Sequence, residues 1–141
     1  MIEEAYKWKK NGHIFLWSFL FNTKNFPGYH MSFDEQGRES FIMLLRKLKK
    51  SSVRIDRTVE LSHPTVDVLM VPNNGQDIST RRSVKIIFDE INIPNFGAGS
   101  DNYELRANSL LLSELEERLM SVQSGRESSL KIGEHILNFW W

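Results

Sequence analysis

The strongest periodic pattern in the chain predicts a helix over residues 34–50. Apolar side chains recur there at intervals of three and four residues, which places them along one stripe of a helix: Phe41, Leu44, Leu45 and Leu48. Ser32 followed by Glu35 has the spacing of a capping box, so we expect Ser32 to cap the N-terminus. Gly37 is expected to weaken the first turns, and basic residues at the end of the helix complement its dipole.

A second helix is predicted from another apolar stripe. Its apolar positions again recur at helical spacing: Leu112, Leu115, Leu119 and Val122. Ser113 and Glu116 repeat the capping-box spacing, so this helix is expected to open at Ser113, and Ser124 and Gly125 are expected to end it. The residues before it, 103–112, are expected to be extended.

Short apolar runs and alternating patterns predict strands at residues 14–21, 53–61, 65–71, 83–88 and 103–112, and one or two within 129–141. Arg57 interrupts the apolar face of the second run. Residues 92–102 hold one proline and two glycines and are expected to form a loop. Together these elements predict a single α+β domain over residues 1–141. Its mainly antiparallel sheet has about six strands, and two helices pack on one face.

The apolar run at residues 14–21 follows three lysines, which is the order of a signal peptide. Glu3 and Glu4 oppose that basic bias, and no small-x-small cleavage site follows the run. A buried strand is therefore favoured over a signal peptide. A membrane-spanning helix needs about 20 apolar residues. This run has eight residues, so the sequence predicts no membrane partner.

The amino-acid composition indicates in which cellular compartment the protein lies and which classes of partner are less expected. With 40% hydrophobic and 26% charged residues, the chain has the balance of a folded globular protein. The absence of cysteine excludes disulfides and thiolate metal sites and fits a reducing compartment, so a cytoplasmic location is expected. Eighteen basic residues balance eighteen acidic residues, so no overall charge directs the protein to nucleic acid or to a membrane.

Histidine is the usual general base near neutral pH, and the chain has four: His13, His30, His63 and His135. No two of them have the spacing of a metal site, and no serine nucleophile motif occurs. A site assembled in space from His30, His63 and either Asp34 or Asp67 is the enzymatic alternative. The favoured interpretation assigns no catalytic, metal-binding or cofactor-binding residue and expects no cofactor.

Residues 46–57 carry six basic side chains and one acidic side chain, Asp56. Such a cluster can bind RNA or an acidic protein surface. Four of the six lie where the end of a helix favours cations, so a solvated helix end is the simpler interpretation. No aromatic RNA-binding motif accompanies the cluster, so nucleic acid is not an expected partner. The acidic counterpart is Glu114, Glu116 and Glu117, at the start of the second predicted helix.

Aromatic content is high for a small core, with nine phenylalanines and four tryptophans: Trp8, Trp17, Trp140 and Trp141. Neighbouring Trp140 and Trp141 on a strand must point to opposite faces, so one can pack inward while the other meets another element or a partner. Packing within the monomer is favoured. Contact with a partner or with a second copy of the chain, as a homo-oligomer, is the alternative.

Two segments resemble a group of small bacterial proteins. One is residues 26–32, Phe-Pro-Gly-Tyr-His-Met-Ser, with Asp34 leading into the apolar helix; the other comprises residues 130–133 and 138–141. In size, lack of cysteine and α+β pattern, the chain resembles immunity proteins of contact-dependent growth inhibition and other polymorphic toxin systems. The resemblance implies a cytoplasmic protein-binding role with a cognate toxin domain as partner, and it assigns no binding residue.

Three functions follow as hypotheses. The favoured one is a non-enzymatic immunity protein that neutralises a cognate bacterial toxin by stoichiometric occlusion. The alternatives are a small enzyme that uses the dispersed histidines and carboxylates, and an RNA-binding or regulatory domain that uses the basic cluster at residues 46–57.

Overall fold

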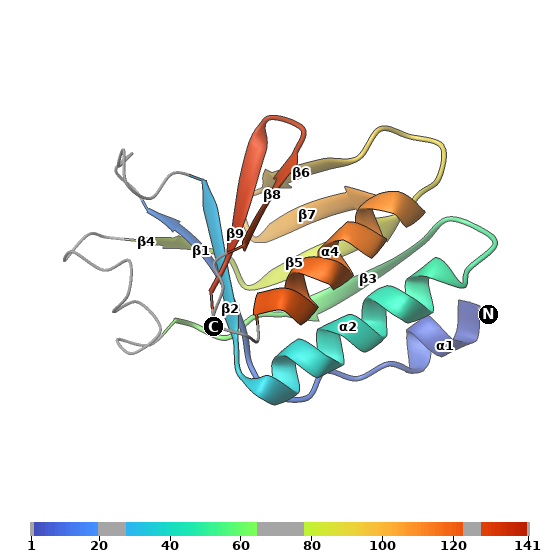
Figure 1. Ribbon diagram of the computed structural model, residues 1–141, viewed down its shortest axis with the longest axis horizontal. Coiled ribbons are helices and arrows are strands. Elements are labelled where there is room, and N and C mark those ends of the chain that lie inside the picture. Colours follow the sequence, from blue (N-terminus) through green and yellow to red (C-terminus); the bar gives the residue numbers. More distant parts are fainter. Residues whose placement is uncertain (1, 20–27, 65–77, 123–127, 141) are drawn as a thin grey trace.

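Two β-sheets and three helices make up the part of the chain that the computed structural model describes, residues 2–19, 28–64, 78–122 and 128–140 (Figure 1). The fold class is α+β, as the sequence pattern predicts. The helices are α1 (Ile2–Lys7), α2 (Glu35–Lys49) and α4 (Ser109–Ser121). The strands are β1 (Ile14–Phe19), β2 (Tyr29–Phe33), β3 (Ile55–Glu60), β4 (Ile78–Thr80), β5 (Ser83–Phe88), β6 (Asn95–Ala98), β7 (Asn102–Ala107), β8 (Ser128–Ile132) and β9 (His135–Phe139).

The five-stranded sheet joins the two ends of the chain. Its strand order is β4-β1-β2-β9-β8, and every neighbouring pair is antiparallel except β2 and β9. In that parallel pair Tyr29 lies opposite Leu137 and Met31 lies opposite Phe139. Because more than 100 residues separate the partners in sequence, no local turn signal could reveal this pairing.

The four-stranded sheet has the order β3-β5-β7-β6, with β5 and β7 parallel and the other pairs antiparallel. The prediction of one mainly antiparallel sheet of about six strands with two helices is therefore correct only in part. Most strand pairs are antiparallel, but the described strands form two sheets with one parallel pair each, and α1 is a third helix. The expected loop at residues 92–102 contains β6, an edge strand paired with β7. Glycine weakens a strand but leaves its backbone N–H and C=O free to pair, and Gly97 lies opposite Glu104 of β7 in the register.

Helix α2 matches the predicted span closely, but its cap was predicted wrongly. Ser32 belongs to β2, and Asp34 is the N-cap. The Asp34 Oδ1 atom accepts the backbone N–H of Gly37 at 2.7 Å and that of His13 at 2.9 Å. A Cβ on Gly37 would collide with the His13 carbonyl. Gly37 is therefore where another segment approaches the first turn closely, rather than only a weak point of the helix.

Helix α4 begins four residues earlier than predicted. Asn108 is its N-cap and its Oδ1 accepts the Leu111 N–H at 2.8 Å, so residues 109–112 are helical rather than extended. Ser113 lies inside the helix. The predicted apolar stripe is confirmed, because all four of its members are buried: Leu112, Leu115, Leu119 and Val122.

The other strand predictions have mixed outcomes. The strand at 83–88 is confirmed as β5, and the segment 129–141 gives the β8–β9 hairpin. Residues 14–19 form β1, which confirms a strand in the described part of the 14–21 run. The strand at 53–61 is shorter, Ile55–Glu60, and Val53 lies exposed before it. The predicted strand at 65–71 lies outside the described residues, as does the predicted helix stop at Ser124 and Gly125.

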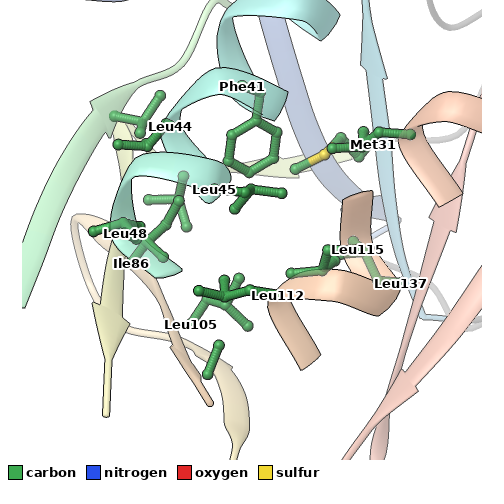
Figure 2. Packing of buried hydrophobic residues seen from close by; sticks show 14 of the residues in the cluster. Met31, Phe41, Leu44, Leu45, Leu48, Ile86, Leu105, Leu112, Leu115 and Leu137 are labelled. Carbon is green, nitrogen blue, oxygen red and sulfur yellow. The ribbon is translucent and has the colours of Figure 1, made fainter. Parts of the chain in front are cut away.

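Helices α2 and α4 pack against each other and lie across one face of the four-stranded sheet (Figure 1). Figure 2 shows leucines of both helices converging with side chains from both sheets: Leu44, Leu45 and Leu48 of α2, Leu112 and Leu115 of α4, Ile86 and Leu105 of one sheet, and Met31 and Leu137 of the other. The Tyr103 hydroxyl donates to the Leu16 carbonyl at 3.3 Å and links the sheets directly. Within the described ranges, every helix is too short or too polar to span a membrane.

Candidate protein-binding surface

One end of the four-stranded sheet carries the three most exposed large apolar side chains among the described residues. Ile91 and Ile93, between β5 and β6, are 92% and 85% exposed, and Leu110 in the first turn of α4 is 69% exposed. Val53, between α2 and β3, is 49% exposed. These segments lie at the same end of the molecule (Figure 1). We name Val53, Ile91, Ile93 and Leu110 the apolar end patch.

The turn that presents Ile91 is built around the buried carboxylate of Asp89. Asp89 Oδ1 accepts the backbone N–H of Ile91 at 3.0 Å and of Asn92 at 3.2 Å. Asp89 Oδ2 accepts the Asn92 side-chain amide at 2.6 Å. An aspartate that bonds the backbone just after it fixes a tight turn, so Ile91 is held pointing away from the core rather than free to fold inward.

The same carboxylate ties neighbouring segments to this turn. Arg106 Nη1 of β7 lies 2.7 Å from Asp89 Oδ2, and Arg54 Nε lies 3.9 Å from it. Glu90 accepts the Ser109 backbone N–H at the start of α4 with a 2.5 Å contact. The segments that carry Val53, Ile91 and Leu110 are therefore joined through the carboxylates of Asp89 and Glu90.

Asp89 is charged at neutral pH because its surroundings favour the carboxylate. The hydrogen bond from the Asn92 side chain, then those from backbone N–H groups and from Arg106, lower the pKa of Asp89 to about 2 from 3.8. Burial acts in the opposite direction and is outweighed. The patch consequently rests on an ionised frame that keeps its geometry over the physiological pH range.

Such an arrangement is suited to binding another protein. Exposed apolar groups that lie together and are bordered by charged side chains mark interaction sites, and interfaces concentrate their energy in a few central apolar anchors. Sequence reasoning missed this surface because its members come from segments that are far apart in the chain. The available signal was the pair Ile91, directly before the predicted loop, and Ile93, within it, two β-branched apolar residues with no strand pattern around them.

The structure places the four histidines in separate surroundings. His30 is buried, accepts the Trp140 indole N–H at 3.0 Å and stacks on Trp17. The His13 ring bonds the Ser62 hydroxyl at 3.0 Å. His135 packs edge-on against Tyr29. These contacts assign structural partners to His13, His30 and His135.

The enzymatic alternative named His30, His63 and either Asp34 or Asp67. Asp34 caps α2. Burial raises its pKa, but hydrogen bonds from backbone N–H groups, those of His13 and Gly37 foremost, together with the nearby His13 ring outweigh burial and lower the pKa. Asp67 lies outside the described residues. No group of three or more His, Asp or Glu in the described ranges could hold a metal ion.

His63 lines a polar pocket of about 780 Å³ beside the ends of β3 and β5. Glu60, Arg82 and Asp101 also line it, together with Ser83. His63 is the single histidine among the described residues of this lining. If the enzymatic alternative were correct, its active site would have to lie in this pocket. Of the two histidines that the alternative names, the pocket lining includes His63 and not His30.

The predicted basic cluster is divided among several partners. Arg46 and Lys49 of α2 both pair with Glu116 of α4, at 3.1 Å and 3.2 Å. Burial raises the pKa of Glu116, but hydrogen bonds and charge from Lys49 and Arg46 outweigh it and lower the pKa. Arg57 donates to the Trp8 carbonyl at 2.6 Å and covers the Trp8 ring. The prediction that the cluster is a solvated helix end is therefore correct only in part, because Arg46, Lys49 and Arg57 bind other parts of the chain.

The tryptophans in the described ranges pack within the chain. Trp8 and Trp17 are buried, and Trp140 is partly buried against His30. Trp141 lies outside the described residues, so the prediction that Trp140 and Trp141 face opposite sides stays a prediction. The favoured interpretation, packing within the monomer, is therefore confirmed for these three tryptophans, and the exposed aliphatic residues of the apolar end patch are better candidates for contact with a partner.

Comparison with known proteins supplies no family. No protein-family model matches the chain, and no curated protein matches it. The functional interpretation therefore depends on the geometry described above.

Proposed function

We propose that the chain is a non-enzymatic immunity protein of the cytoplasm that neutralises a cognate bacterial toxin domain by stoichiometric occlusion. The observation that supports this proposal is the apolar end patch, whose side chains are exposed and whose Ile91 lies on a turn fixed by the ionised Asp89. The proposal places the toxin domain on Ile91, Ile93 and Leu110.

The exposed side chains of the patch would gain free energy on burial by a partner. Transfer of one isoleucine side chain from water into an apolar contact contributes about 1.5–3 kcal/mol, and Ile91 and Ile93 are almost fully available for it. Because Asp89 already fixes the turn, binding loses little conformational entropy there. A partner that covers roughly 800 Å² of this end would form an interface of the standard size.

The test uses the C-terminal domain of the protein encoded immediately upstream of this chain, which the proposal expects to be the toxin domain, with binding measured by calorimetry and protection by growth. Ile91→Asp combined with Leu110→Asp should weaken binding by about 100-fold or more, because a charge would be buried at each anchor. Met120→Asp is the control, since Met120 is also an exposed apolar residue of α4 but lies outside the patch.

Two results would show that the toxin domain does not bind the apolar end patch. One is an equal loss of binding affinity in the control and in the double variant, and the other is wild-type affinity in a folded double variant. Failure of the purified chain to bind that toxin domain at all would contradict the immunity function itself. Loss of function on His63→Ala alone would favour the enzymatic alternative, because His63 lines the polar pocket and not the patch.

A further inference from the structure

A second surface follows the outer side of α2, where α1 and the residues after it pack against this helix. One pocket of about 480 Å³ lies beside the last turns of α2, and another of about 310 Å³ lies between α2 and residues 7–11. Met43 and Lys47 line both pockets. We name these two connected hollows the α1–α2 groove.

Every ionisable side chain that lines the groove in the described ranges is basic. Lys7 and Lys9 line one pocket, Lys50 lines the other, and Lys47 lines both. In the portion of the chain that the structure describes, none of these four lysines forms an ion pair, whereas Arg46 and Lys49 are paired with Glu116. The groove therefore has an excess of positive charge although the chain as a whole is neutral.

The base of the groove is apolar. Met43 is 46% exposed, and the lining of both pockets is mostly carbon, which includes the aliphatic stems of the lysines. Methionine adapts to differently shaped apolar partners because it is unbranched and flexible. A side chain seated on Met43 would thus be surrounded by ammonium groups.

The walls of the groove are held in place before any partner binds. The Trp8 indole N–H donates to the Ser40 carbonyl of α2 at 2.8 Å, and the Asn11 backbone N–H donates to the Ser40 hydroxyl at 3.0 Å. Arg57 holds the Trp8 carbonyl from β3. A preformed groove binds a ligand with a smaller entropy loss than one that must be assembled.

We propose that the α1–α2 groove docks an acidic, amphipathic segment of a protein partner. Apolar side chains of that segment would seat on Met43, and its carboxylates would meet Lys47, Lys50 and the lysines of residues 7–9. Charge complementarity favours this occupant, since the rim presents unpaired cations over an apolar base. The proposal does not depend on the apolar end patch or on the immunity function.

The same observations argue against RNA as the occupant. Binding of single-stranded RNA draws on exposed aromatic faces for base stacking. The aromatic ring that lines the groove, Trp8, is 6% exposed and its face is covered by Arg57. Lysine also lacks the planar fork with which arginine binds phosphate in two places.

The probe is a fluorescein-labelled synthetic peptide of about 15 residues, with leucines at helical spacing and glutamates elsewhere. We expect wild-type protein to bind it with an affinity that falls as salt rises, because screening weakens the contacts with the lysines. Lys47→Glu and Lys50→Glu should each weaken binding by about tenfold or more. Met43→Asp should weaken it as well. Lys131→Glu is the matched control, since Lys131 is an exposed lysine of β8 that does not line the groove.

Three results would overturn the proposal. The first is no binding of the peptide, or equal binding of a version with glutamine in place of glutamate. The second is an equal loss in Lys131→Glu, which would show general attraction to charge. The third is tighter binding of a single-stranded oligouridine than of the peptide. Circular dichroism of each variant separates lost binding from lost folding, and the exposed Lys50 gives a variant with little effect on the core.

Discussion

Single carboxylates organise the loops of this protein by bonding backbone N–H groups or arginine side chains from more than one segment. Asp34 bonds the backbone of His13 as well as the first turn of α2. Asp89 bonds its own turn and also arginines of β7 and of the segment before β3. Neither role was predicted, because the partners of each carboxylate come together only after folding. The type of residue was informative, since aspartate is common at caps and turns.

At the residue scale, Asp89 should make stability depend on pH. Its pKa is about 2 in the folded protein against 3.8 for the ordinary group, so its contribution is present above about pH 4 and is lost as the pH falls towards 2. Asp89→Asn removes the titrating charge. We expect the difference in urea midpoint between wild type and this variant to shrink between about pH 6 and about pH 2.5.

Asp34 and Glu116 also have lowered pKa values, but both residues are present in wild type and in the Asp89→Asn variant. The difference between the urea midpoints of the two proteins at each pH therefore reports the contribution of Asp89 alone. A difference between the two proteins that does not change with pH would contradict the assignment. Such a result would mean that Asp89 acts through its hydrogen bonds alone.

At the element scale, predictability follows the strength of the local pattern. Helix α2 and strand β5 were predicted nearly to their ends because the apolar residues of α2 recur at helical spacing and those of β5 lie in one short apolar run. The start of α4 was misplaced because Ser113 has capping-box spacing, whereas the cap used is Asn108. Strand β6 was missed because its pairing with β7 comes from the sheet and not from its own four residues.

Buried leucines on the two long helices give a stability test. Leu45 of α2 and Leu119 of α4 are fully buried. Leu45→Ala and Leu119→Ala should each lower the free energy of unfolding by about 2–5 kcal/mol, through lost transfer energy and the cavity left behind. Met120→Ala, next to Leu119 but exposed, should change it by about 0.5 kcal/mol or less. Urea denaturation measures all three, and an unchanged midpoint in both leucine variants would contradict the assigned helix faces.

At the scale of the whole molecule, contacts between distant segments decide both the topology and the surfaces. The parallel pairing of β2 with β9 cannot be predicted from the sequence of either strand, because the two strands are far apart in the chain and meet only in the folded protein. For the same reason the basic cluster at residues 46–57 was predicted without Lys7 and Lys9, which α1 brings beside α2. The apolar end patch likewise combines residues from two connecting segments and from the first turn of α4, which are far apart in the sequence.

An occluding binder and an enzyme differ in how protection depends on dose, which gives the prediction for the molecule as a whole. Occlusion requires one chain for each toxin molecule, so protection should saturate at a fixed ratio, whereas turnover would protect at far lower ratios. His13→Ala, His63→Ala and His135→Ala should leave protection largely intact, because these three histidines lie outside the apolar end patch.

His30→Ala needs a separate measurement, since His30 is buried between Trp17 and Trp140 and its loss is expected to destabilise the fold. We expect the folded fraction of this variant, measured by circular dichroism, to protect as well per molecule as wild type. Growth assays at graded ratios of chain to toxin provide the readout. Protection at strongly substoichiometric amounts, or its loss in a folded variant of one histidine, would contradict occlusion and favour a catalytic role for that side chain.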